Sequence, residues 1–182
     1  MMKKTLAFVI GFFISMTVLA DPIANFIDSY TEQEKIVIWI TENTKTNMNE
    51  ERIRETVRMV YAKSQTNGLD PHFVLGMILQ ESEFNTRAKS FAGAAGLMQV
   101  IPRWHRDKIG NRNIYNPVVN VDVGVDVLVE CIQKNKNNIR KAVSCYSGGA
   151  NQYYRKVTNH QKKFQVAVKQ DSFPTLLLMA MN

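Results

Sequence analysis

Apolar residues recur at helical spacing through most of the chain, and no segment alternates as a half-buried strand does. Thr31 and Glu34 form a capping box that predicts a helix ending near Asn43. After a polar loop, Asn49 caps a second helix, which Gly68 ends. The pattern therefore predicts a domain built from helices.

A third helix begins at Asp70 and is apolar on most sides from Val74 to Leu79, which predicts that it is buried. Glu81 falls at its C-terminal end. Burial and the negative end of the helix dipole both disfavour a carboxylate there, so the pKa of Glu81 should be raised. A carboxyl group kept neutral near pH 7 is what a general acid for glycosidic bond cleavage requires.

The middle of the chain is irregular. Residues 84–96 are rich in Gly, Ala and Ser and predict a loop, and residues 97–101 predict a short helix ended by Pro102. Residues 103–115 are polar and are a candidate rim for a groove.

Three more helices are expected after this region. Asn116 caps the first, Asn137 or Asn138 starts the second, and a basic helix covers about residues 151–164. Asn120, near the start of the first of these, is interpreted as a structural residue that bonds backbone groups.

The first twenty residues have the pattern of a secretory signal peptide. Lys3 and Lys4 precede an apolar stretch over residues 6–19, and Ala20 suits a cleavage site. The stretch is shorter than the roughly 20 residues that a spanning helix needs, which disfavours an uncleaved anchor. Cleavage lowers the net charge from +7 to +5, which suits an anionic partner such as the cell wall, and no nucleic-acid motif is present.

Export permits a disulfide between Cys131 and Cys145, which would add about 3 kcal/mol of stability. On antiparallel helices joined near Lys136, the two residues would be offset by roughly 3–4 Å, so the pattern leaves the bridge open. The three histidines are scattered without zinc-ligand spacing, and neither a metal nor a cofactor is expected.

Five short motifs follow one another within residues 55–165: Glu81-Ser82, Ser90, Gly96-Leu97-Met98-Gln99, Asn120 with Gly124, and Tyr146 with Gly149. In this order and spacing they resemble the soluble lytic transglycosylase family. The resemblance implies an all-α, predominantly helical fold of the α+β lysozyme-like superfamily, as a single compact goose-type domain over residues 49–166. A helical extension over residues 21–48 would precede it, and an apolar tail over residues 167–182 would follow.

The resemblance also implies roles for single residues. Glu81 would be the catalytic acid, with Tyr146 beside it as a hydrogen-bond donor that limits the rise of its pKa. The substrate-binding residues would be Ser90, Gly96, Met98, Gln99 and Tyr146, with Gly96 allowing close approach of the backbone to the sugar. Ser147 stands where the family often has Asn, which puts one sugar subsite in doubt.

The expected reaction uses Glu81 first as acid and then as base. It would cleave the β-1,4 bond between N-acetylmuramic acid and N-acetylglucosamine, and the muramic acid 6-hydroxyl would close a 1,6-anhydro ring. One alternative is a muramidase that uses water, assisted by Glu83 or Asp107. The other is a non-catalytic wall-binding assembly module.

The expected location is the periplasm, and the expected partner is peptidoglycan. The compact form resembles the specialised transglycosylases of envelope-spanning secretion, conjugation or pilus machinery. Residues 21–46 and the apolar tail would be the surfaces for such partners. No membrane-spanning segment is expected once the signal peptide is removed.

Overall fold

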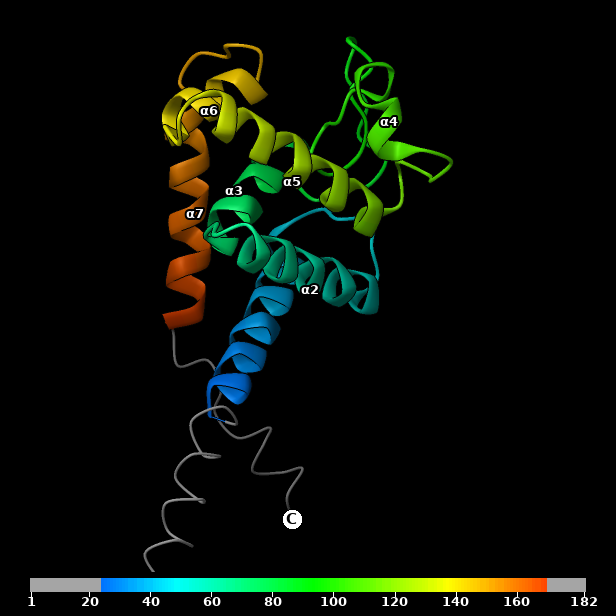
Figure 1. Ribbon diagram of the computed structural model, residues 1–182. Coiled ribbons are helices and arrows are strands. Elements are labelled where there is room, and N and C mark those ends of the chain that lie inside the picture. Colours follow the sequence, from blue (N-terminus) through cyan, green and yellow to red (C-terminus); the bar gives the residue numbers. More distant parts are fainter. Residues whose placement is uncertain (1–23, 170–182) are drawn as a thin grey trace, which may run out of the picture. The chain divides into compact units, whose positions relative to one another are not determined.

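The computed structural model describes residues 24–169 (Figure 1). The predicted signal peptide and residues 170–182 of the predicted tail lie outside this range. The described residues divide into two units, with residues 24–34 in the first and residues 35–169 in the second. Among the described residues, no helix combines the length and the apolar character needed to cross a membrane.

Helices make up the regular structure of the described residues. They are residues 24–43, α2 (Glu50–Thr66), α3 (Pro71–Ser82), the 3-10 helix η1 (Pro102–Trp104), α4 (Arg106–Ile109), α5 (Pro117–Lys134), α6 (Ile139–Tyr146) and α7 (Tyr153–Lys169). The prediction of a predominantly helical protein is confirmed.

The predicted N-terminal caps account for where most of these helices begin. The side chains of Asn49, Asp70, Asn116 and Asn138 each accept a hydrogen bond from a backbone N–H two or three residues further on. Such bonds satisfy amide groups that have no partner inside the helix. The open choice for the start of α6 is settled as Asn138.

Two local predictions were wrong. Residues 24–43 are already helical before Thr31, so the capping box there does not start a helix. Residues 97–101 form a turn, because Gln99 adopts a left-handed φ of 49° and the backbones of Ala95 and Val100 pair across it. Pro102 begins η1, where the fixed φ of proline suits a first helical position.

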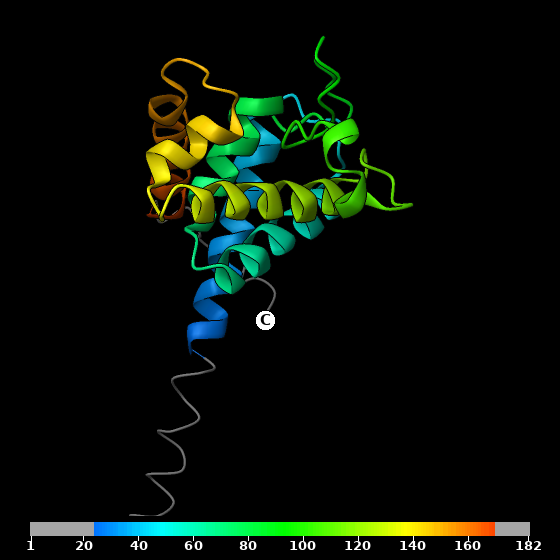
Figure 2. The same ribbon diagram turned by 45° about the horizontal axis from the view of Figure 1, so that its top comes forward.

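Helix α3 lies at the centre of the second unit and packs along α7, while α5 packs on α2 and α6 (Figure 2). Seven consecutive residues of α3, from Phe73 to Leu79, are buried. Gly76 permits the close approach of α7, because a Cβ atom at this position would lie 2.8 Å from the carbonyl oxygen of Val157. The apolar run that precedes Glu81 is therefore the core of the domain.

Part of the predicted N-terminal extension belongs to this core. Ile36, Val37 and Ile40 are buried, and the ring of Trp39 meets Phe164 of α7 edge to face at 4.6 Å between centroids. These residues thus belong to the same core as Phe164 of α7.

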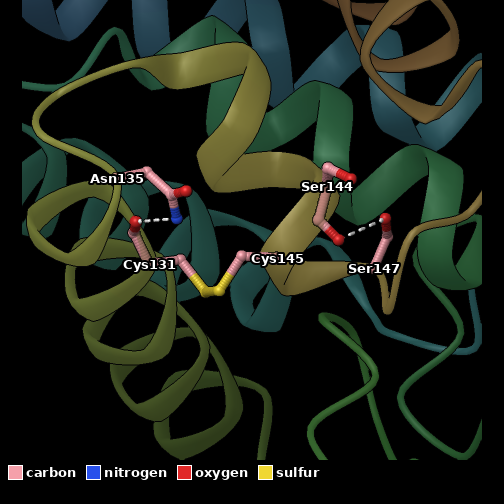
Figure 3. Close-up of a disulfide and its surroundings, with 5 residues drawn as sticks. All are labelled: Cys131, Asn135, Ser144, Cys145 and Ser147. Atoms are coloured by element: carbon pink, nitrogen blue, oxygen red, sulfur yellow. Dashed lines mark hydrogen bonds between the residues drawn. A yellow bond between two sulfur atoms is a disulfide. The ribbon is translucent and has the colours of Figure 1, made fainter.

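Cys131 and Cys145 form a disulfide that joins α5 to α6 (Figure 3). Their Cα atoms are 5.9 Å apart, within the usual range for a bridge. Lys136 and Asn137 take positive φ values in the tight turn between the helices. The bridge therefore fixes the end of α6, where Tyr146 follows Cys145 directly.

Candidate functional site

Glu81 lies in the last turn of α3, and the chain changes direction immediately after it. Glu83 takes a left-handed φ of 50°, and its N–H bonds the Leu79 carbonyl to close the helix. The Ser82 hydroxyl lies 2.8 Å from the carbonyl oxygen of Leu97, which joins the helix end to the loop of residues 88–100. Phe84 is fully buried and anchors the chain beyond the turn.

The carboxyl group of Glu81 is held in a poorly solvated position. Burial raises its pKa above the ordinary value, and a hydrogen bond from Tyr153 acts in the opposite direction. The Tyr153 hydroxyl lies 2.5 Å from Oε1 of Glu81. The pKa of Tyr153 is itself strongly raised by burial and by the charge of Glu81, so this phenol remains a hydrogen-bond donor.

The donor to Glu81 was predicted to be Tyr146, and that prediction was wrong. The Tyr146 hydroxyl donates instead to the carbonyl oxygen of Met98, at 2.7 Å. Its pKa is raised by burial and by the charge of Glu81, so Tyr146 lies within the field of the carboxyl group without bonding it. Tyr153, the first residue of α7, provides the bond and was missed, because no feature of the sequence pairs it with a residue 72 positions away.

Asn120 organises the loop that faces this helix end. It is fully buried; its Oδ1 accepts from the N–H of Met98 at 2.7 Å, and its Nδ2 donates to the carbonyls of Ala95 and Ile114, both at 2.9 Å. The interpretation of Asn120 as a structural residue is confirmed. It bonds the loop as well as the backbone ahead of α5, and so places both relative to Glu81.

Two residues predicted to bind substrate have a structural role as well. Gly96 is buried with φ +75°, and a Cβ atom there would lie 2.2 Å from Nδ2 of Asn120. Glycine is therefore required to admit the Asn120 side chain, and the approach of its backbone to a sugar stays a prediction. Met98 is fully buried against Gly124, so its side chain belongs to the core, and a contact of this residue with substrate stays a prediction.

Ser90 and Gln99 remain partly exposed on the same loop. Nε2 of Gln99 donates to the carbonyls of Gly96 at 3.0 Å and Ala88 at 3.2 Å. Oγ of Ser90 accepts from the N–H of Ala94 at 3.0 Å. Both side chains thus help to shape the loop, and their contact with a sugar stays a prediction.

Neither candidate for a second carboxylate acts on Glu81 within the part of the chain that the structure describes. Glu83 is exposed beyond the helix end, and Asp107 is exposed on α4, with Lys108 Nζ 3.5 Å from its carboxylate. The pKa of Glu81 responds to burial and to Tyr153, and to neither of these acids. Across residues 24–169, no group of three or more His, Cys, Asp and Glu side chains is arranged to hold a metal ion.

Several known proteins are similar to this chain. Over 164 residues it is 31% identical to membrane-bound lytic murein transglycosylase C of Glaesserella parasuis, covering 75% of this chain and 45% of that protein. Over 91 residues it is 36% identical to a transglycosylase of Enterobacteria phage PRD1, covering 50% of this chain and 34% of that protein. The chain thus spans less than half the length of these relatives.

A solved structure of an inactive mutant of the lytic transglycosylase Slt from Pseudomonas aeruginosa also matches, with 20% identity and a TM-score of 0.47. The match covers 61% of this chain and 22% of that one. The family model of the transglycosylase SLT domain matches residues 58–167, a segment that runs from α2 to the end of α7 and includes Glu81, Asn120 and Tyr153. The chain belongs to the transglycosylase SLT domain family.

Proposed function

We propose that this protein is a peptidoglycan lytic transglycosylase that cleaves the β-1,4 bond between N-acetylmuramic acid and N-acetylglucosamine. The observation that carries the proposal is the partly buried Glu81 with its raised pKa and its bond to Tyr153, inside the segment that matches the family. The relatives named as lytic murein transglycosylases support the choice of substrate.

Glu81 acts twice in the proposed reaction. Its neutral form donates a proton to the glycosidic oxygen as the bond to the anomeric carbon breaks. The resulting carboxylate then accepts the proton of the muramic acid 6-hydroxyl, whose oxygen bonds the anomeric carbon and closes the 1,6-anhydro ring. Glu81 ends protonated, as it began, and no water is consumed.

Tyr153 stabilises the intermediate state of this cycle. Its hydrogen bond to Oε1 favours the carboxylate that exists between the two proton transfers, and it leaves the other oxygen of Glu81 to carry the proton. Burial alone would hold the acid too tightly to its proton, while solvent exposure would ionise it before reaction. A pKa between these limits suits a group that must be acid and base in turn.

The geometry favours an internal nucleophile over an activated water. A hydrolytic muramidase of the two-carboxylate type needs a second acid close to the first. Glu83 and Asp107 are both exposed, whereas Glu81 lies in a poorly solvated position. The muramic acid 6-hydroxyl is part of the bound sugar, and its proximity replaces a positioned water.

Ser90 and Gln99 are the proposed sugar contacts on the loop, because both are partly exposed on the segment that Ser82 joins to the end of α3.

We place the enzyme in the periplasm, on the basis of the signal-peptide pattern of residues 1–20. A role beside secretion, conjugation or pilus machinery is also proposed, and it rests on the family resemblance of the sequence alone.

Mass spectrometry of muropeptides released from purified sacculi tests the reaction, with the Glu81→Gln variant as the inactive control. The expected products end in 1,6-anhydromuramic acid and are one water lighter than hydrolysis products. Products that contain the added water would establish a muramidase instead. Binding to sacculi without release of muropeptides by the wild-type protein would establish a non-catalytic module.

A further inference from the structure

A pocket of about 580 Å³ is lined by residues of the loops around α4, and Glu81 is not among them. Figure 1 shows α4 and these loops. Its floor is apolar and includes Ala95, Ile101, Pro102, Ile109 and Ile114. Lys89, Arg103 and Arg106 add three cations to the lining. We call these three residues, with the apolar floor, the basic pocket.

The cations of the basic pocket differ from their neighbours in having no carboxylate partner. Lys108 and Arg112 come from the same segment and pair with Glu130 and Asp122 of α5, at 2.6 and 2.7 Å. These two pairs hold the segment against the helix. Across residues 24–169, no ion pair involves Lys89, Arg103 or Arg106.

Exposed aromatic side chains accompany these cations. The ring of Trp104 is 63% exposed, and the guanidinium carbon of Arg103 lies 5.1 Å from the centroid of this ring. Phe91, next to the pocket residue Ala92, is fully exposed. The basic pocket therefore combines apolar surface with positive charge that no carboxylate neutralises. Such a pocket suits a ligand that carries both carboxylates and small apolar groups.

The basic pocket also adjoins the loop on which the glycan is proposed to lie. Ala95 of its floor pairs with Val100 across the turn that carries Gln99. A group covalently attached to a bound sugar at this turn would thus be within reach of the pocket. The ligand should be an anionic substituent of the glycan strand.

We propose that the basic pocket binds the acidic stem peptide that muramic acid residues of peptidoglycan carry. The carboxylates of the peptide pair with Lys89, Arg103 and Arg106, and its alanine methyl groups cover the apolar floor. The inference rests on the proposed function, and it makes the enzyme selective for glycan strands that still carry their peptides. A flat anionic membrane surface would contact the exposed Phe91 and Trp104 but would leave the hollow floor unfilled.

The test compares two substrates: purified glycan strands with their stem peptides, and the same strands stripped by an amidase. The variant is Lys89→Gln/Arg103→Gln/Arg106→Gln in the full chain, and the control is Arg58→Gln, which removes an exposed cation of α2. For the triple variant, KM on peptide-bearing strands should rise about tenfold, a loss of about 1.4 kcal/mol in binding. Its kcat, and all its kinetics on stripped strands, should equal those of the wild type.

Direct binding separates this inference from the proposed reaction. Free stem tetrapeptide is titrated into the Glu81→Gln protein by calorimetry, at low and at high salt. Binding that weakens with salt and is lost in the triple variant supports the pocket, even if no strand is cleaved. The proposal is wrong if the peptide does not bind, if both substrates lose activity equally, or if the triple substitution abolishes only binding to vesicles containing anionic phospholipid.

Discussion

The end of α3 and the loop of residues 88–100 both carry polar side chains, but they use them in opposite ways. In the loop, polar side chains bond the backbone: Gln99 does so from within the loop, and Asn120 does so from α5. Glu81 has one hydrogen bond to oppose its burial, and its pKa remains raised. The helix end therefore supplies the reactive group, while the loop supplies the shape around it.

The largest expected effect comes from removing the reactive group. Glu81→Gln should lower turnover about 10³-fold or more, because the amide cannot donate and then accept the proton. Glu83→Gln, two residues away and exposed, is the matched control and should retain wild-type turnover. The rate at which muropeptides are released from sacculi measures the turnover of both variants. Equal losses in the two variants would mean that Glu81 has no special role.

Disrupting the loop should cost stability. Asn120→Ala removes three hydrogen bonds and leaves the buried N–H of Met98 and carbonyl of Ile114 without this partner, while the Ala95 carbonyl keeps its bond from Val100. The substitution should reduce the free energy of unfolding by about 3 kcal/mol. Gly96→Ala should also destabilise, because its methyl group would overlap the Asn120 amide. Urea denaturation of the single and double variants measures the coupling. The double variant should lose less than the two single losses together, and strict additivity would contradict the proposed reason for glycine.

Removing the bond to Glu81 should change both the rate and its pH dependence. Tyr153→Phe should lower turnover about tenfold, since a hydrogen bond to a charged group contributes roughly 1.5–3 kcal/mol. The bond lowers the pKa of Glu81, so its loss raises that pKa further. Because Glu81 must be protonated to act as the acid, the alkaline limb of the kcat profile should move to higher pH.

The neighbouring Tyr154 provides the control for this experiment. Its ring lies 4.6 Å from the guanidinium carbon of Arg140, and Phe would keep that stacked arrangement. Tyr154→Phe should therefore leave both the rate and the alkaline limb in place. A shift of the limb in this variant, or no shift in Tyr153→Phe, would remove Tyr153 from its proposed role.

The smallest expected effect is on stability as a function of pH. A carboxyl group whose pKa is raised on folding stabilises the folded state most at low pH, and that stabilisation is lost as pH rises through the folded pKa. Glu81→Gln should therefore have a higher Tm than the wild type at pH 7. The difference should vanish near pH 4.5, the ordinary value for this group. Thermal unfolding at both pH values checks this, and a constant difference would argue against the raised pKa.

Local sequence signals, such as helix caps, were enough to predict most of the helices. Asn49, Asp70 and Asn116 cap helices as predicted, because a cap bonds an amide only two or three residues away. The raised pKa of Glu81 was also predictable, since an apolar run and a helix end lie directly beside it. The turn at residues 97–101 was not predictable from the sequence. Its backbone pairing and the left-handed conformation of Gln99 depend on Asn120, which lies outside the turn.

Sequence patterns predicted most of the helices, the reactive acid and the family resemblance. The folded structure was needed to establish which tyrosine bonds the acid, that Gly96 makes room for Asn120, and which cations around α4 lack a carboxylate partner. The physical reason is distance along the chain. Caps and apolar periodicity act within a few residues, whereas Tyr153 and Glu81 are 72 residues apart and meet because α3 and α7 pack together.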